Sequence, residues 1–135
     1  MADKLMRTVV VMSFFLALAL FSGCGTNEAI ITDSDNGRQI TVKPGDVVTV
    51  SLDSNPTTGY SWQVIEIDNT VLIQDGDPEY KQDAGSAGLV GAGGTETFRF
   101  KATGSGETSL KLGYRRPWEN VPPIENFSVK IVVQG

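Results

Sequence analysis

The sequence predicts an all-β protein, an antiparallel β-sandwich of about seven to eight strands. Apolar and polar residues alternate in several segments, among them "DVVTVSL" (46–52), "TFRFKA" (97–102) and "NFSVKIVV" (126–133). Such alternation indicates half-buried strands, and runs rich in Gly, Pro, Asn and Asp separate them as turns do. No segment after residue 24 has the pattern of an amphipathic helix. Because one sheet cannot bury its apolar face alone, we expect two packed sheets.

The expected strands follow from the alternation and the turn signals between them. They lie at residues 28–33, 38–42, 46–52, 60–67, 71–75, 94–102, 107–114 and 124–133. Trp62 alternates with Val64 in the fourth strand, so we expect its side chain in the core. Short strands at this spacing are typical of a sandwich or a barrel. The length allows one domain comfortably, and we place it at residues 35–135.

Composition excludes several classes of function. The formal net charge of −5 disfavours nucleic acid, because phosphate binding needs a positive surface. The chain has no histidine, which removes the commonest general base and the commonest metal ligand. Acidic residues that could serve a glycosidase lie in turn-like stretches without evident pairing, at Asp33, Asp35, Asp75, Asp77 and Asp83. We therefore expect no enzyme, no metal and no cofactor.

The N-terminal segment reads as an export signal at residues 1–23. Basic Lys4 and Arg7 precede an apolar run at 8–21, and small residues lead to the only cysteine, Cys24. The run is shorter than the ~20 residues of a spanning helix, so a transmembrane anchor is the weaker alternative. A lone cysteine also excludes a disulfide within the chain.

The residues before Cys24 resemble a bacterial lipobox, although Phe21 stands where that motif prefers Leu. The resemblance implies acylation of Cys24 and anchoring to a membrane of the cell envelope. Residues 24–34 would then be a lipid-anchored tether that runs into the first strand. Without acylation the protein would be secreted.

Three connections contain more specific combinations of residues than a linker needs. They are "NPTTGY" (55–60), "AGLVGAGG" (87–94) and "RRPWE" (115–119). In an immunoglobulin-like strand order they are the B–C, D–E and F–G loops, and all three lie at one end of the sandwich. Each also has a plainer interpretation. The first could be a self-bonded Asx or Ser/Thr turn, the second a flexible linker, and Trp118 of the third could fold back on the sheet.

The residue types in these loops suit a contact surface. Pro56 fixes φ at its own position and Gly59 permits a left-handed turn residue. Thr57 and Thr58 lie between them, so we expect their hydroxyls to point in defined directions. The glycine-rich loop lacks the Lys and Ser/Thr of a phosphate-binding loop, but it carries two apolar residues, Leu89 and Val90. In the third loop, Trp and Arg are the residue types most enriched at binding hot spots.

Together, "NPTTGY", "GAGG" preceded by Leu-Val, and "RPW" resemble the chagasin family of cysteine-peptidase inhibitors over roughly residues 35 to 134, with Tyr60 where Phe is also common. The resemblance implies an immunoglobulin-like sandwich that inhibits papain-type cysteine peptidases reversibly, without a covalent bond. It implies a target-binding set of Asn55, Pro56, Thr57, Thr58, Gly59, Tyr60, Leu89, Val90, Gly91, Gly93, Gly94, Arg116, Pro117 and Trp118.

The resemblance also implies a role for each loop. The B–C loop would cover the catalytic cysteine and histidine of the peptidase, with Thr57 closest. The D–E loop would lie in the unprimed substrate cleft, with Leu89 or Val90 toward its apolar pocket. The F–G loop would cover the primed side, where Trp118 meets an aromatic residue. We expect a monomer that binds one peptidase. The alternative is a surface adhesion or protein-binding module that inhibits no peptidase.

Overall fold

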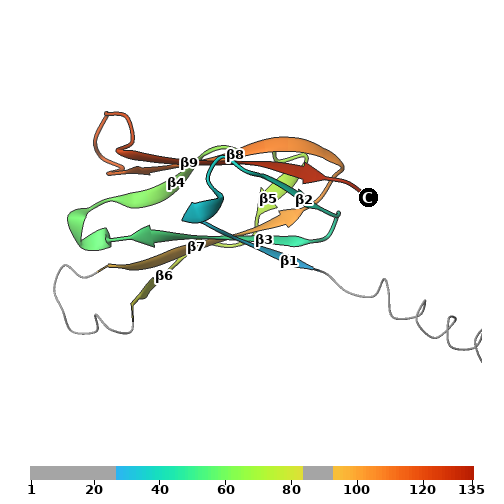
Figure 1. Cartoon of the computed structure of the whole chain (residues 1–135). Coiled ribbons are helices and arrows are strands. Elements are labelled where there is room, and N and C mark those ends of the chain that lie inside the picture. The colour runs from blue at the N-terminus through green and yellow to red at the C-terminus, as the bar shows by residue number, and fades with distance from the viewer. Residues whose placement is uncertain (1–26, 84–92) are drawn as a thin grey trace, which may run out of the picture.

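Two β-sheets pack face to face in the computed structural model, which describes residues 27–83 and 93–135 (Figure 1). The first sheet contains β1 (Glu28–Thr32), β3 (Val47–Ser54), β7 (Gly94–Ala102) and β5 (Leu72–Gln74) in that order, and β6 (Glu79–Gln82) also pairs with β7. The second contains β2 (Gln39–Val42), β9 (Glu125–Val133), β8 (Gly106–Arg115) and β4 (Ser61–Glu66) in that order. The two-sheet sandwich predicted from the alternation is confirmed.

The core lies between the sheets and is formed by the inward residue of each alternating pair. Phe98 and Phe100 come from β7 and Leu110 and Leu112 from β8, and all four are buried. Burial of each such side chain contributes about 1.5–3 kcal/mol relative to exposure. Trp62 also belongs to the core, as predicted, with 7% of its surface exposed.

Two features of the sheets were not predicted. β1 pairs with β3, and β2 with β9, in parallel, whereas the sequence suggested a purely antiparallel sandwich. The chain crosses from one sheet to the other between β1 and β2, and it returns before β3, so neighbours in one sheet need not be consecutive. The second feature is β6, which lies outside the strands expected from the sequence. All four of its residues are exposed, so their pattern shows no alternation.

Short 3₁₀ turns at Asp33–Asp35 (η1) and Pro56–Thr58 (η2) are the helical elements of the described residues. None of the helices found within 27–83 and 93–135 has the length and apolar character needed to cross a membrane. The predicted signal peptide, Cys24 and the first part of the predicted tether lie outside the described residues.

Strand pairing brings the described ends of the three connections to one end of the sandwich. Ser54, the last residue of β3, pairs with Gly94, the first of β7. In the other sheet Ser61 of β4 pairs with Arg115 of β8, and Tyr114 of β8 pairs with Glu125 of β9. The β3–β4 and β8–β9 connections therefore project from the same end (Figure 1).

Candidate functional site

The β3–β4 loop, residues 55–60, is held rigid by its own backbone. Pro56 begins the 3₁₀ turn, where its fixed φ suits the first position and its missing N–H is not needed. Gly59 ends the turn in a left-handed conformation with φ of +86°, which favours glycine. Its N–H donates to the Pro56 carbonyl oxygen at 2.9 Å.

The two threonine hydroxyls of this loop bond to Asn55. The Thr57 Oγ1 donates to Asn55 Oδ1 at 2.5 Å, and the Thr58 Oγ1 donates to the Asn55 carbonyl oxygen at 2.6 Å. The turn is therefore self-bonded, as the plainer interpretation proposed. The same bonds also hold the hydroxyls in place while Pro56, Thr57 and Thr58 remain exposed to solvent.

Arg116, at the start of the β8–β9 loop, joins that loop to the β3–β4 loop. Its Nε donates to the Thr58 carbonyl oxygen at 3.0 Å, and its Nη1 bonds to Glu119 Oε1 at 3.1 Å. The guanidinium carbon lies 4.4 Å from the centroid of the Tyr60 ring, within the range of a cation–π contact. Arg116 therefore holds the two loops together, with its own side chain partly exposed.

Trp118 is the most exposed large apolar side chain of the described residues, with 71% of its surface accessible. It does not fold back on the sheet. A Cβ built on Gly59 would lie 2.5 Å from Cη2 of Trp118, so the edge of the indole rests against that glycine. Pro117, beside it, is also exposed. Two loops that are far apart in sequence therefore form one continuous surface.

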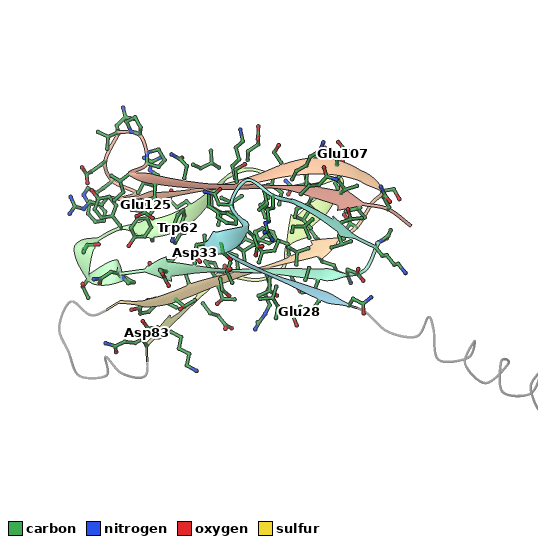
Figure 2. All side chains as sticks on the ribbon, in the orientation of Figure 1. Glu28, Asp33, Trp62, Asp83, Glu107 and Glu125 are labelled. Atoms are coloured by element: carbon green, nitrogen blue, oxygen red, sulfur yellow. The ribbon has the colours of Figure 1, made fainter. Side chains whose placement is uncertain are left out.

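The third connection is described only at its ends. Leu89, Val90 and Gly91 lie outside the described residues. Gly93 accepts a backbone hydrogen bond from Asp83, the last described residue before the connection (Figure 2). Gly94 is buried, and a Cβ there would collide with the Lys81 carbonyl oxygen. Glycine is needed at 94 so that β6 can approach β7.

Two residues beneath the loops were missed by sequence reasoning. The Tyr114 hydroxyl accepts a hydrogen bond from the Asn55 N–H at 2.8 Å, and its ring stacks on Tyr60. The Glu96 carboxylate is buried between the sheets near Trp62, which lies toward the loop end (Figure 2). Glu96 carried a signal, because it occupies an inward position in an alternating strand where an apolar residue is expected.

The arrangement suits contact with a protein more than small-molecule chemistry. An open cavity of about 570 Å³ lies below the loops, and its lining includes Ser54, Asn55 and Trp62 but none of Thr57, Thr58, Arg116 and Trp118. Within residues 27–83 and 93–135, no group of three or more His, Cys, Asp or Glu could hold a metal ion. The exposed residues of the two loops instead project from one end of the sandwich.

A sandwich of two β-sheets with loops gathered at one end has the architecture of the immunoglobulin-like class of proteins. Comparison with known proteins identifies the family. Residues 41–131 match the model of the chagasin family of peptidase inhibitors, I42, so the chain belongs to that family. This membership confirms the resemblance, and it confirms an inhibitor rather than an enzyme.

Individual relatives agree with the family assignment. Amoebiasin-1 of Entamoeba histolytica is 36% identical over 107 residues, which cover 77% of this chain and 98% of amoebiasin-1. Chagasin of Trypanosoma cruzi is 35% identical over 92 residues, 65% of this chain and 81% of chagasin. The crystal structure of the cysteine protease inhibitor EhICP2 from Entamoeba histolytica superposes with a TM-score of 0.74 at 25% identity, covering 83% of this chain and all of EhICP2.

Proposed function

We propose that the protein inhibits papain-type cysteine peptidases reversibly, by inserting the loop end of the sandwich into the substrate cleft. The observation that carries the proposal is the joint surface of two loops, in which exposed Trp118 rests on Gly59 and Arg116 bonds to the Thr58 carbonyl oxygen. Family membership and relatives named as cysteine protease inhibitors support the same function.

The contacts within the loops support tight binding without covalent chemistry. A standard interface buries ~1,600 Å², and its affinity depends strongly on how much freedom is lost on association. Here Pro56, the bonds to Asn55 and the Arg116 bridge restrict the loops before any partner arrives. Less entropy is therefore lost on binding.

Each loop is assigned to one part of the cleft. Residues 55–59 cover the catalytic cysteine and histidine, with exposed Thr57 at the closest approach. Arg116, Pro117 and Trp118 cover the primed side, where Trp118 packs on an aromatic residue of the enzyme. Leu89 and Val90 occupy the unprimed side, an assignment that follows the family motif. One monomer binds one peptidase.

Competition kinetics with papain test this assignment. Because the loops and a peptide substrate occupy the same cleft, the apparent inhibition constant should rise linearly with the substrate concentration. Chymotrypsin, which has a serine nucleophile and a different cleft, is the control and should keep full activity. An inhibition constant that does not change with substrate concentration would place the contact outside the cleft.

We also propose that the protein is exported and anchored to the cell envelope through acylated Cys24. The basic start, the apolar run at 8–21 and the small residues before Cys24 support this proposal. A single acyl chain binds membranes weakly, whereas two chains give stable anchoring. Labelling with radioactive palmitate in a bacterial host should mark the wild type and not Cys24→Ser. Equal labelling of both would contradict acylation at this residue.

A further inference from the structure

We propose that Glu96 is a positioning residue of the inhibitory surface, whose buried carboxylate holds both ends of the β3–β4 loop and makes that loop resistant to cleavage. The inference rests on the proposed inhibition of papain-type peptidases. Glu96 itself does not reach the surface, since only 6% of it is exposed. It therefore acts on the partner through the loop that it holds.

The position of Glu96 in β7 is one that normally carries an apolar side chain. The inward residues of this strand are Gly94, Glu96, Phe98, Phe100 and Ala102, and all are buried. Burying a carboxylate among such residues is costly unless hydrogen bonds replace the lost water. A group kept in such a place therefore has specific partners, and the structure shows them.

The two carboxylate oxygens bond on opposite sides of the loop. Oε1 accepts a hydrogen bond from Ser54 Oγ at 2.9 Å, and Ser54 is the last residue of β3. Oε2 accepts from the Trp62 backbone N–H at 2.9 Å, and Trp62 is the second residue of β4, in the other sheet. The Glu96 carboxylate thus fixes the separation of β3 and β4, the two strands that the loop connects.

The bond to Trp62 satisfies a donor that the sheet leaves without a strand partner. Within residues 27–83 and 93–135, β4 pairs with β8 alone, and its Trp62 N–H donates to the Glu96 carboxylate in the other sheet. A buried backbone N–H without an acceptor is unfavourable, so loss of the carboxylate would favour a shift of β4. Such a shift would move the loop that begins at Asn55.

Two further bonds complete the base of the loop. The Asn55 N–H donates to the Tyr114 hydroxyl at 2.8 Å, and Trp62 Nε1 donates to the Asp53 carbonyl oxygen at 2.9 Å. Residues on both sides of the loop are therefore tied to the core. A peptidase must draw an extended segment through its active site in order to cut it, and a loop closed at its base resists this.

Stability and positioning can be separated at this residue. Leucine has nearly the size of glutamate, and apolar replacements of buried charged groups are often neutral or stabilising. Glu96→Leu keeps the volume but removes both bonds. Glu96→Gln keeps both, because the amide oxygen can accept from Trp62 and the amide nitrogen can donate to Ser54 Oγ. Ser54→Ala removes one bond and leaves the core volume almost unchanged.

The test compares these variants of the full chain, in mild detergent, with active papain. For Glu96→Leu we expect the inhibition constant to rise about tenfold or more, mainly through faster dissociation. We also expect fragments from cleavage within residues 55–60 on a gel. Glu96→Gln should stay within about threefold of the wild type and remain intact, and Ser54→Ala should lie between the two.

Leu72→Ala is the matched control for stability. Leu72 is fully buried in β5 and pairs with Ala102 at the far end of β7 from the loops. It should lower Tm clearly, as large-to-small core substitutions do, while the inhibition constant stays within about threefold. If inhibition falls in proportion to Tm across all variants, Glu96 acts through stability and the inference is wrong.

Amide hydrogen exchange in the chain without a peptidase gives a second, independent readout. The Asn55 and Trp62 amides should exchange faster in Glu96→Leu and at the wild-type rate in Glu96→Gln. Wild-type exchange in Glu96→Leu, or cleavage of Glu96→Gln as fast as Glu96→Leu, would overturn the inference. Failure of the wild type to inhibit papain and related cathepsins would instead overturn the proposed function. The exchange rates would then still test whether Glu96 holds the ends of the β3–β4 loop.

Discussion

The two ends of the sandwich are built from the same strands but have different turns. At the end away from the loops, the β2–β3 turn is closed by Asp46, whose carboxylate accepts from the backbone N–H of Lys43 at 2.9 Å and of Asn27 at 3.2 Å. Gly45 in this turn has φ of +91°, and a Cβ there would meet no atom within 4 Å.

At the loop end, Gly59 has almost the same backbone conformation, with φ of +86°, but the edge of Trp118 rests on it. Gly45 serves only to let the chain turn. Gly59 lets the chain turn and also contacts the exposed Trp118 ring of the second loop. The loop end therefore keeps an apolar side chain exposed in a defined place, which a turn by itself does not need.

The largest expected effect comes from Gly59→Ala. The new methyl group would meet Trp118 and would also strain a left-handed residue, so both loops must move. We expect inhibition of papain to weaken by about 2–3 kcal/mol, at least as much as the loss of a hot-spot side chain. Gly45→Ala is the matched control, with the same backbone strain and no neighbour. A similar loss of inhibition in both would contradict the comparison.

Trp118→Ala should weaken inhibition by about 2 kcal/mol, or roughly 30-fold, as truncation of a hot-spot tryptophan does. The midpoint of thermal unfolding should hardly change, because the ring is mostly exposed. Ile30→Ala serves as a control, since Ile30 is 68% exposed on β1 and lies outside the loops. A loss of less than a few tenths of a kcal/mol for Trp118→Ala would remove this residue from the site.

Arg116→Lys should have a smaller effect, about 1 kcal/mol on the inhibition constant. Lysine keeps the charge but cannot donate along the fixed directions that reach the Thr58 carbonyl oxygen and Glu119 together. Arg99→Lys on the outer face of β7 is the control for the substitution itself. Unchanged inhibition by Arg116→Lys would show that the loops need the charge and not the bridge.

Asp46→Ala should have the smallest effect on inhibition and a clear effect on stability. Loss of its two backbone hydrogen bonds should lower the free energy of unfolding by about 1–2 kcal/mol, as loss of a turn or helix cap does. Under conditions in which the variant is folded, its inhibition constant should stay within about twofold of the wild-type value. A loss of inhibition that matches the loss of folding free energy would show that the two ends of the sandwich are coupled.

Much of the fold could be predicted because alternation and turn residues are local signals. The burial of Trp62 follows from alternation, and the position of the described loop ends at one end of the sandwich follows from strand order. The parallel pairing of β1 with β3 could not be read, because alternation records which face is buried and not which neighbour a strand has. β6 has four exposed residues and leaves no such record.

The sequence motifs located the loops of the candidate site but not the contacts between them. Arg116 donates to the Thr58 carbonyl oxygen across 58 positions of sequence, which no local pattern encodes. Tyr114 alternates with the buried residues Leu110 and Leu112 in β8, as an ordinary core aromatic would. Glu96 was visible as a charged residue on an apolar face, and its partners became evident only when both sheets were in place.

Inhibition by an intact loop is tested by titrating active papain with the full chain in mild detergent and then running the mixture on a gel. We expect activity to fall to zero at one inhibitor per active site, and we expect the inhibitor band to remain intact. Steady cleavage of the inhibitor during the titration would contradict the braced loop. Full activity at every ratio, for papain and for a panel of related cathepsins, would contradict the proposed inhibition.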